Sequence, residues 1–380
     1  MGLNKLIDKV NYNARMNCCG CGACLAVCPV NSIYAVVKER GTIYYEINDN
    51  CIGCGKCKKV CPIEDDLFYP DQKRFYKAIT KKKDVLQSSS SGGIAYELSA
   101  NVIRKGGVVY GAGWNYDEQL VQHIRIDSVE QLSVLQGSKY VQSRISESTY
   151  KNICNDLKEK KVLVIGCPCQ IAAIRKLTKD SHNLICVDII CHGVPSSKLL
   201  NEQLKSITNE RVESISFRDG LNFRLAVESK NYSYRSNGLD NPYYSLYLQF
   251  VTLRESCYKC KYATRRRVGD ITLGDYVESN SRFSCVVFST QKGSELLLSI
   301  QDAIKYEESN AMELNKNHAF NKPTERNIKT DKFTKLYEIY GLQNAYYRCF
   351  SFFVFKRFLR KIMGEHLYST LIIKIKRIDR

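Results

Sequence analysis

Cysteines at a fixed spacing are the residues of this chain whose types and positions most clearly indicate chemistry. The pattern CxxCxxCxxxCP occurs twice, at residues 18–29 and 51–62. Three thiolates two residues apart on a tight loop can surround one [4Fe-4S] cube, and the fourth cysteine of such a run ligates the cluster of the other copy. A pair of zinc knuckles is the alternative, but zinc takes its ligands from one local group and does not explain the proline. The spacing therefore predicts two [4Fe-4S] clusters.

Each predicted cluster takes three cysteines from one copy of the pattern and the fourth from the other. Cluster one is expected to be held by Cys18, Cys21, Cys24 and Cys61, and cluster two by Cys51, Cys54, Cys57 and Cys28. Glycines beside these cysteines, Gly20, Gly22, Gly53 and Gly55, let backbone N–H groups approach the sulfur atoms. The extra cysteine of this segment, Cys19, is expected to be a loop thiol without a ligand role.

The composition is that of a folded protein with a strong positive charge. The chain has 380 residues, 44% of them hydrophobic, and its 57 Lys and Arg against 39 Asp and Glu give a formal net charge of +18. That hydrophobic fraction excludes a disordered polycation. No run approaches the ~18 apolar residues of a membrane helix, and the N-terminus lacks the apolar core of a secretory signal. We expect a cytoplasmic protein, whose cysteines are interpreted first as metal ligands because cytosolic thiols stay reduced.

Beyond the cysteine-rich segment, strand patterns alternate with helix patterns. Short β-branched runs predict strands at residues 108–110, 122–126, 161–165, 184–190 and 285–288. Apolar periodicity predicts helices at residues 94–104, 146–159, 170–177, 198–207 and 294–304. This alternation favours an α/β domain with a partly parallel sheet. Residues 212–235 are expected to form an antiparallel excursion, and residues 63–74 a linker.

Glycine and hydroxyl clusters lie at the boundaries of these expected elements. The dinucleotide fingerprint fails, because Gly111 and Gly113 are followed by Tyr116 at the third glycine position, and no GxxxxGK run occurs. Residues 90–93, with the sequence SSGG, open a predicted helix, where N–H groups and hydroxyls suit the phosphate of a flavin or deazaflavin. A capped helix after a flexible turn would have the same sequence, so both interpretations stay open.

Four cysteines lie where the expected strands end or in loops beyond them. These are Cys169, Cys191, Cys257 and Cys260. Strand ends at one edge of an α/β sheet converge in space, so the four thiols could ligate one further metal centre. A set of ordinary buried or redox-active cysteines is the equal alternative from spacing alone. The cysteines at 154, 186, 285 and 349 lie inside helix or strand patterns and are expected to be small buried hydrophobes.

The order of motifs resembles the coenzyme F420 hydrogenase/dehydrogenase beta-subunit family over roughly residues 1–290. The motifs that carry the resemblance are the dicluster head, SSGG, KGGVVYGA, GSKYVQS, CPCQIA, CHGVPS, the later CxxC and GDITLGD. The resemblance implies an FAD-binding α/β core that holds a third [4Fe-4S] cluster, with the four cysteines above as its ligands. It implies a flavin and coenzyme surface made of Ser90, Ser91, Gly92, Gly93, Gly137, Ser138, Lys139, Tyr140, Gln142 and Ser143.

Two positions depart from the family pattern. Cys167 stands where relatives commonly have Thr, and Tyr276 follows Asp275 where many relatives have an aromatic residue and Trp. We therefore expect a different substrate face. The expected architecture is an α+β ferredoxin-like dicluster head at 1–66, an α/β mixed-sheet flavin-binding core at 75–310 and a helical basic C-terminal region at 311–380.

The expected function is an iron–sulfur flavoprotein oxidoreductase. FAD exchanges a hydride with F420, a nicotinamide or an organic substrate and exchanges single electrons with the clusters, which exchange them with an acidic carrier such as ferredoxin. The direction of flow is open. Lys139 is the candidate contact to the flavin or an anionic substrate, and His192 the candidate proton donor. Both residues can equally be structural, and for His192 the structural interpretation is preferred.

Two alternative functions start from the basic residues. Runs at 81–83 and 265–267, together with the net charge, favour a nucleic-acid-binding iron–sulfur protein, but no recognised binding module occurs. We expect no nucleic acid and interpret Lys56, Lys58 and Lys59 as compensating charge beside cluster two and as a dock for an acidic carrier. The aromatic and basic tail at 345–380 resembles a surface helix that would contact a membrane peripherally. A helix packed on the core, with a solvated basic face, is the preferred alternative.

Overall fold

A computed structural model describes residues 17–65, 67–70, 74–276, 282–309 and 317–378, with side chains up to residue 364. The chain divides into two compact units, Met1–Arg326 and Asn327–Arg380. The first unit holds the cysteine-rich head and the core, so these two parts form a single packed body. Each unit is described by itself below.

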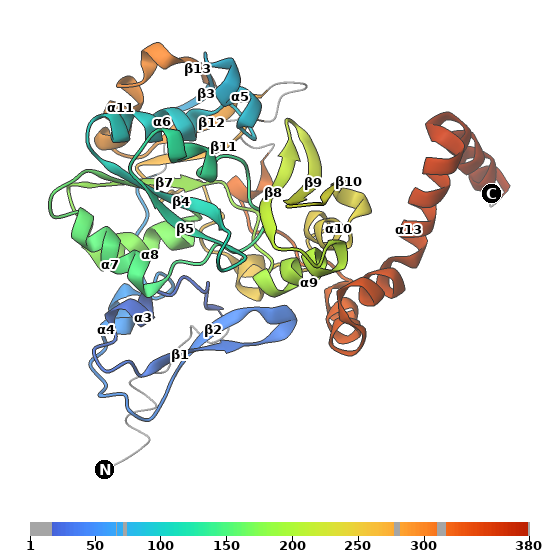
Figure 1. Cartoon of the computed structure of the whole chain (residues 1–380), viewed down its shortest axis with the longest axis horizontal. Helices are drawn as coiled ribbons and strands as arrows, with labels where there is room; N and C mark the ends of the chain where they lie inside the picture. The colour runs from blue at the N-terminus through green and yellow to red at the C-terminus, as the bar shows by residue number, and fades with distance from the viewer. Residues whose placement is uncertain (1–16, 66, 71–73, 277–281, 310–316, 379–380) are drawn as a thin grey trace. The chain divides into compact units, whose positions relative to one another are not determined.

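One eight-stranded mixed sheet organises the core (Figure 1). Its strands are β3 (Phe75–Thr80), β4 (Val108–Asn115), β5 (Leu120–Ile126), β6 (Val162–Gly166), β7 (Leu184–Ile189), β11 (Ile271–Asp275), β12 (Ser284–Phe288) and β13 (Ile304–Ser309). They lie in the order β13-β3-β12-β11-β7-β6-β4-β5. The central strands β4, β6, β7 and β11 are parallel, and the outer pairs are antiparallel. The expected mixed α/β core is therefore confirmed.

Alternating side chains of the central strands point to opposite faces, because strands have a period of two. In β6, Val162 and Val164 pack on the layer that contains α7 (Glu147–Asp156) and α8 (Pro168–Thr178), whereas Leu163 packs on the other layer. That other layer holds α6 (Ile94–Arg104) and α11 (Gln291–Leu298). Figure 1 shows these helix pairs on opposite sides of the sheet. The apolar runs of the central strands are buried on both faces for this reason.

A smaller antiparallel sheet lies beside the main one. Its strands β8 (Val212–Asp219), β9 (Asn222–Ser229) and β10 (Ser233–Asn237) pair in the order β10-β9-β8. Helices α9 (Ser197–Ile207) and α10 (Pro242–Leu248) flank the excursion. Trp114 Nε1 donates to Val212 O at 3.1 Å and so connects β4 to β8. The antiparallel excursion expected at 212–235 is confirmed.

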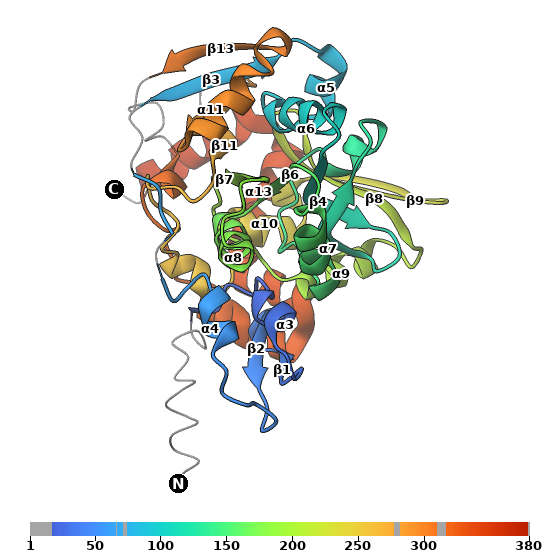
Figure 2. The ribbon, with the colours of Figure 1, turned by 90° about the vertical axis from the view of Figure 1, so that its left-hand side faces the viewer.

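The head packs directly on the core. Its elements are α3 (Ala23–Val27), β1 (Ile33–Val37), β2 (Ile43–Ile47) and α4 (Lys56–Val60). Helix α3 contacts α7 and α8, and α4 contacts α8, as both ribbon views show (Figure 1, Figure 2). Cys21, Ala23 and Val60 belong to the same apolar cluster as the core strands β4, β6 and β7. Head and core therefore share one hydrophobic layer.

Two expected segments differ from the structure. The helix predicted at 294–304 ends at Leu298, because a 3-10 turn follows at Gln301–Ala303 and Ile304 begins the edge strand β13. Within the segment expected to be a linker, the described residues are tied to the core: Arg175 donates to Leu67 O and the Tyr69 N–H to Arg267 O. Part of that segment, residues 66 and 71–73, lies outside the described residues.

The second unit is one long helical segment, α13 (Thr330–Ile378), interrupted at Gly341, Phe350 and Gly364. Inside this unit the Lys329 ammonium group lies 4.4 Å from the centre of the Phe350 ring. Within the described part of the chain, no helix combines the length and apolarity that crossing a membrane requires.

Candidate functional site

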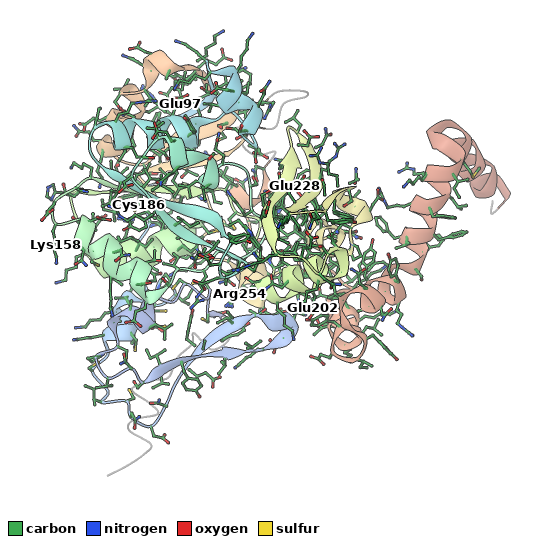
Figure 3. All side chains as sticks on the ribbon, viewed as in Figure 1. Glu97, Lys158, Cys186, Glu202, Glu228 and Arg254 are labelled. Carbon is green, nitrogen blue, oxygen red and sulfur yellow. The ribbon has the colours of Figure 1, made fainter. Side chains whose placement is uncertain are left out.

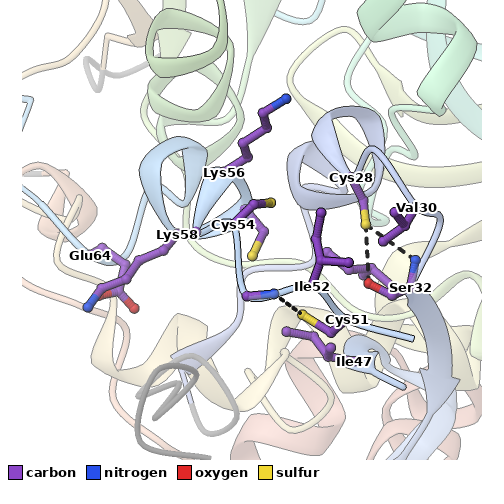
Figure 4. A pocket seen from close by; sticks show the side chains of 14 residues that line it. Cys28, Val30, Ser32, Ile47, Cys51, Ile52, Cys54, Lys56, Lys58 and Glu64 are labelled. Carbon is purple, nitrogen blue, oxygen red and sulfur yellow. Dashed lines mark hydrogen bonds and ion pairs between the residues drawn. The ribbon is translucent and has the colours of Figure 1, made fainter. Parts of the chain in front are cut away.

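The four cysteines expected for cluster two line one cavity at the surface of the head (Figure 4). Cys51, Cys54 and Cys57 come from one copy of the pattern and Cys28 from the other, as the crossed assignment requires. The Gly53 N–H points to Cys51 Sγ at 3.5 Å, and the Ser32 N–H to Cys28 Sγ at 3.3 Å. These donors suit thiolate sulfurs, and Cys54 is the exposed member of the group.

The cysteines expected for cluster one gather on the side of the head that faces the core. Cys21, Cys24 and Cys61 are buried. Burial raises the pKa of Cys24 well above its usual range, and the nearby thiols of Cys18 and Cys61 raise it further. Burial also raises the pKa of Cys61 to about 11. Thiols that disfavour one another's ionisation in this way suit a metal site, because the positive charge of the metal core stabilises them as thiolates.

Both copies reach this geometry through the same backbone conformation. Gly20 and Gly53 have φ of 69°, and Gly22 and Gly55, which precede α3 and α4, have φ of 80° and 70°. Side chains rarely adopt this left-handed region, so glycine is required for the tight loop. Each short helix then ends at the fourth cysteine of its copy. These are the four glycines that the sequence analysis expected beside the sulfur atoms.

Core side chains anchor the loop of cluster one by donating to its carbonyl oxygens. Gln142 Nε2 donates to Cys19 O at 3.1 Å, Tyr150 Oη to Cys21 O at 2.9 Å and Ser256 Oγ to Cys18 O at 3.1 Å. Lys176 Nζ donates to Cys61 O at 2.7 Å. Gln142 was expected on the flavin surface, and the structure directs its side chain to the head instead.

The four core cysteines come together with two further thiols. Cys191 follows β7, Cys169 lies in α8, and Cys257 and Cys260 lie in or next to the 3-10 turn Glu255–Lys259. The thiols of Cys191 and Cys260 both raise the pKa of Cys257, after burial as the largest cause. No three His, Cys, Asp or Glu side chains among the described residues are placed to hold a single metal ion.

Cys191 repeats a feature of the head. The Gly193 N–H points to Cys191 Sγ at 3.4 Å, as the Gly20 N–H points to Cys18 Sγ at 3.4 Å. In both cases the glycine lies two residues after the cysteine and has a positive φ. Cys18, Cys51 and Cys191 therefore share one C-x-G loop, which the sequence analysis used for the head but not for Cys191.

Cys19 and Cys167, which the sequence analysis did not include among the predicted ligands, lie next to them in the structure. A hydrogen bond with the Cys169 thiol is the largest cause that lowers the pKa of Cys19 well below its usual range. A hydrogen bond with Cys191 is the largest cause that raises the pKa of Cys167. Cys19 therefore lies next to Cys169 of the core and Cys21 of the head, and Cys167 lies next to Cys191.

A cavity of about 310 Å³ lies beside the core thiols. The expected flavin residues Ser90, Ser91, Gly93, Gly137, Ser138, Lys139, Tyr140 and Ser143 line it, together with Cys167, Cys191 and His192. Gly92 and Gln142 are not among the lining residues. Gly92 is buried, and its N–H donates to Ser284 Oγ at 3.0 Å. Helix α6 starts at this wall with Gly93 as its N-cap and no side-chain cap, so its first N–H groups have no intrahelical acceptor.

His123 closes one part of the cavity as a neutral base. Its Nε2 donates to Ile165 O at 3.1 Å, so its Nδ1 accepts from Ser143 Oγ at 2.9 Å. Burial lowers the pKa of His123 to about 4. Burial likewise lowers the pKa of Lys139 to about 7, and the Lys139 ammonium donates to Gln136 O at 2.7 Å.

His192, a candidate catalytic residue, is paired inside the protein. Its Nδ1 lies 3.4 Å from His318 Nε2, whose other neighbour is Thr324 Oγ1 at 3.2 Å. The Thr324 hydroxyl donates its hydrogen to His192 O at 2.7 Å, so Thr324 Oγ1 accepts from His318 Nε2. His318 Nε2 is therefore protonated and faces Nδ1 of His192 as a donor. Burial lowers the pKa of His192 to about 4. The arrangement leaves Nε2 of neutral His192 as the protonated nitrogen.

The comparisons with known proteins agree with this geometry. Residues 159–313 match the family model that describes the C terminus of the beta subunit of coenzyme F420 hydrogenase/dehydrogenase. Residues 13–67 match a 4Fe-4S dicluster domain. The resemblance expected from the sequence is therefore confirmed over these residues.

Two known proteins are similar to parts of this chain. An uncharacterized protein of Methanocaldococcus jannaschii is 27% identical over 205 residues, covering 44% of this chain and 54% of the relative. The chain thus spans about half the length of the curated relative it matches. The F420-reducing [NiFe] hydrogenase complex from Methanosarcina barkeri contains a chain with 19% identity and a TM-score of 0.47; the match covers 66% of this chain and 88% of that one.

Several side chains of the basic runs at 81–83 and 265–267 form contacts within the fold. Lys82 pairs with the buried Glu97 at 2.9 Å, and Lys81 Nζ donates to Asp302 O at 2.9 Å. Arg267 is 1% exposed and pairs with Asp188 at 3.3 Å. Side chains used in this way do not form a surface for nucleic acid, which removes most of the support for that alternative.

Proposed function

We propose that this chain is an iron–sulfur flavoprotein that passes electrons between a hydride carrier or organic substrate and a one-electron carrier. One observation carries the proposal: thiols lie in an unbroken order from the cavity to the surface of the head. Cys167 and Cys191 line the cavity, Cys169 and Cys19 connect the core thiols to cluster one, and Cys54 of cluster two is exposed. A cofactor in the cavity would thus be linked to solvent through the protein.

The cavity suits FAD in charge and in polarity. The uncapped N-terminus of α6 and the hydroxyls of Ser90 and Ser91 suit a diphosphate, because unpaired N–H groups and the helix dipole both favour anions. Leu135, Ile165 and Leu273 offer apolar walls for a ring system. FAD would supply the conversion between a hydride and single electrons. Lys139 would hold the anionic part, and His192 would offer its Nε2 proton.

For the core thiols we propose a third [4Fe-4S] cluster with Cys169, Cys191, Cys257 and Cys260 as ligands. The shared C-x-G loop of Cys191 supports this set, because N–H donors to sulfur stabilise thiolate ligands. Cys167 is the N-cap of α8 and forms a capping box with Gln170, in which its N–H donates to Gln170 Oε1 at 3.1 Å. We keep Cys167 as a neighbour of the ligands at the cavity wall.

The surface around cluster two suits an acidic protein carrier such as ferredoxin. Lys56 and Lys58 line the cavity of cluster two, and Ile52 beside them is 63% exposed (Figure 4). An apolar centre with basic residues around it favours a transient complex with an acidic partner. The family model's name supports F420 as the hydride carrier, with a nicotinamide or an organic molecule as the alternatives.

The test is anaerobic purification with iron, sulfide and flavin measured in the same sample. Three clusters and one flavin give about twelve irons and one FAD per chain. Each of F420H₂, NADH, NADPH and reduced ferredoxin is then mixed with the protein, and flavin absorbance is followed. We expect bleaching by ferredoxin and by one hydride donor. Eight irons with flavin would remove the core cluster, and zinc without flavin would overturn the proposal.

A second candidate role, contact with an anionic membrane surface, rests on α13. Phe352, Phe355, Phe358 and Ile362 are each more than half exposed and lie on one face of the helix. Lys356, Arg357, Arg360 and Lys361 lie on the other sides of this stretch. Such amphipathic basic helices bind anionic lipid surfaces. Flotation with anionic vesicles should recover the full chain and not a chain that ends at residue 344; equal recovery would contradict the role.

A further inference from the structure

Arg254 is a buried cation between the head and the core (Figure 3). Its residue is 2% exposed. Its backbone belongs to the core: the N–H donates to Val194 O at 2.9 Å, and the carbonyl accepts the Cys257 N–H at 2.9 Å. Its side chain belongs to the head, because Nη1 donates to Ile43 O at 2.8 Å. Arg254 thus joins the Cys257 loop to the head.

The guanidinium group lies against the loop of cluster one. A Cβ added at Gly20 would lie 2.3 Å from Arg254 Nη2, so only glycine leaves room for it. The guanidinium carbon also lies 4.7 Å from the centre of the Tyr44 ring. The guanidinium group therefore lies against the loop of Cys18, whereas the Arg254 backbone belongs to the loop of Cys257.

No carboxylate of the described residues forms an ion pair with Arg254, and its Nε has no acceptor. Three other buried arginines each have a carboxylate partner. Arg40 faces Glu255, Arg175 faces Asp180 and Arg267 faces Asp188. Buried charges in proteins are normally paired, because an unpaired one loses its hydration without compensation. The missing negative charge next to Arg254 matches a [4Fe-4S] cluster with four thiolates, which is net negative.

We propose that Arg254 is the counter-cation of cluster one and holds its reduction potential above that of the same cluster without the arginine. A fixed positive charge in a low-dielectric site stabilises the reduced, more negative state of the cluster. Because Cys257 lies in the same loop as Arg254, the cation also faces the core thiols. This role of Arg254 requires cluster one to be bound but requires neither the flavin nor the third cluster.

The test measures the midpoint potential of cluster one by redox titration with EPR detection in the full chain. Arg254→Met keeps the length of the side chain and removes its charge, and Arg254→Lys keeps the charge. We expect a more negative midpoint in R254M and a value close to that of the wild type in R254K. Arg40→Met is the matched control, because Arg40 is also buried at the junction of head and core but has Glu255 as its partner.

Iron analysis first shows that cluster one is present in each variant. Should R254M lose the cluster, Arg254→Gln provides a second neutral variant of polar character. An unchanged midpoint in a neutral variant that retains its iron would overturn the proposal. An equal shift in R254K or in R40M would overturn it too, because the effect would then follow packing rather than charge. Normal iron content without any flavin would reject the proposed function and leave this inference intact.

Discussion

Single buried groups around the cavity carry charge states that differ from those in water. His123 and His192 stay neutral because burial removes the hydration of the imidazolium form. Lys139 is charged for only part of the physiological pH range for the same reason. The cavity is therefore lined by neutral bases and one titrating cation, which makes ligand binding and stability sensitive to pH.

His123→Gln should weaken the loss of stability in acid. The unfolded chain protonates His123 near its ordinary pKa of ~6.5, whereas the folded chain does so at about 4. Between these two pH values the unfolded state binds more protons than the folded state, so the free energy of unfolding falls as the pH falls. The contribution of His123 is complete above pH 6.5 and is lost toward pH 4, by roughly 3 kcal/mol in total. Urea unfolding from pH 7.5 to 4.5 measures it, and the exposed His182→Gln is the control. Parallel curves for H123Q and the wild type would contradict the argument.

Lys139→Met should remove a pH dependence of flavin retention. The ammonium is charged below about pH 7 and loses its charge above it. An anionic flavin should therefore bind more tightly at pH 6 than at pH 8, and K139M should bind about tenfold more weakly at pH 6 with little change at pH 8. Equilibrium dialysis with FAD measures both values. A pH profile of K139M parallel to that of the wild type would contradict the role of Lys139.

At the scale of elements, the ends of the parallel strands bring the site together. Cys167 follows β6, Cys191 follows β7 and Asp275 ends β11, and all three line one cavity. Strand ends of a parallel sheet converge, as the sequence analysis assumed. A buried ion pair connects the same strands: Arg267 pairs with Asp188 of β7 and donates to Thr272 of β11.

Arg267→Met should lower the free energy of unfolding by about 3–5 kcal/mol, because it leaves the Asp188 carboxylate buried without its cation. The double variant Asp188→Asn, Arg267→Met should lose less, since it removes both charges. The adjacent Arg266 is exposed, so Arg266→Met is the control and should stay within about 0.5 kcal/mol. Chemical denaturation measures all three. A double variant as unstable as R267M would show that packing, not charge, decides the loss.

Most helices and strands of the core could be predicted from local sequence patterns. The contacts between distant segments of the chain could not. Helix α6 was predicted at its observed bounds, because its apolar face and its opening glycine are local signals. The edge strand β13 and its neighbour β3 mix polar and apolar residues, so their sequences show no clear alternation. Gln142 and Arg254 contact the head across more than 120 residues of chain, so no spacing could reveal them. The cysteine runs were predictable because metal ligation fixes their spacing.

At the scale of the molecule, the two groups of cysteines in the head differ in their surroundings. Cys21, expected for cluster one, lies in the layer shared with the core, and Cys54, expected for cluster two, is exposed. The net charge of +18 also has to be corrected at this scale, because thiolates and clusters add negative charge that the formal count omits. The basic residues therefore compensate anions that the chain itself holds.

Cys54→Ser and Cys24→Ser should distinguish an exposed cysteine of the head from a buried one. Each variant should lose the iron of one cluster, about four atoms per chain. C54S changes an exposed thiol, so its melting temperature should stay near that of the wild type. C24S changes a buried thiol at the junction with the core, so it should also melt at a lower temperature. Iron analysis and thermal unfolding measure both effects, and the opposite order of melting temperatures would contradict the assignment.

The shared layer of head and core also has a kinetic consequence. Because Cys21, Ala23 and Val60 pack on the core strands, the two parts never need to find each other by diffusion. Electron transfer between them should be a first-order process whose rate is independent of dilution and nearly independent of ionic strength. Transfer to an outside carrier should be second-order and should slow as salt screens the lysines around cluster two. Stopped-flow measurements at two salt concentrations distinguish the two steps.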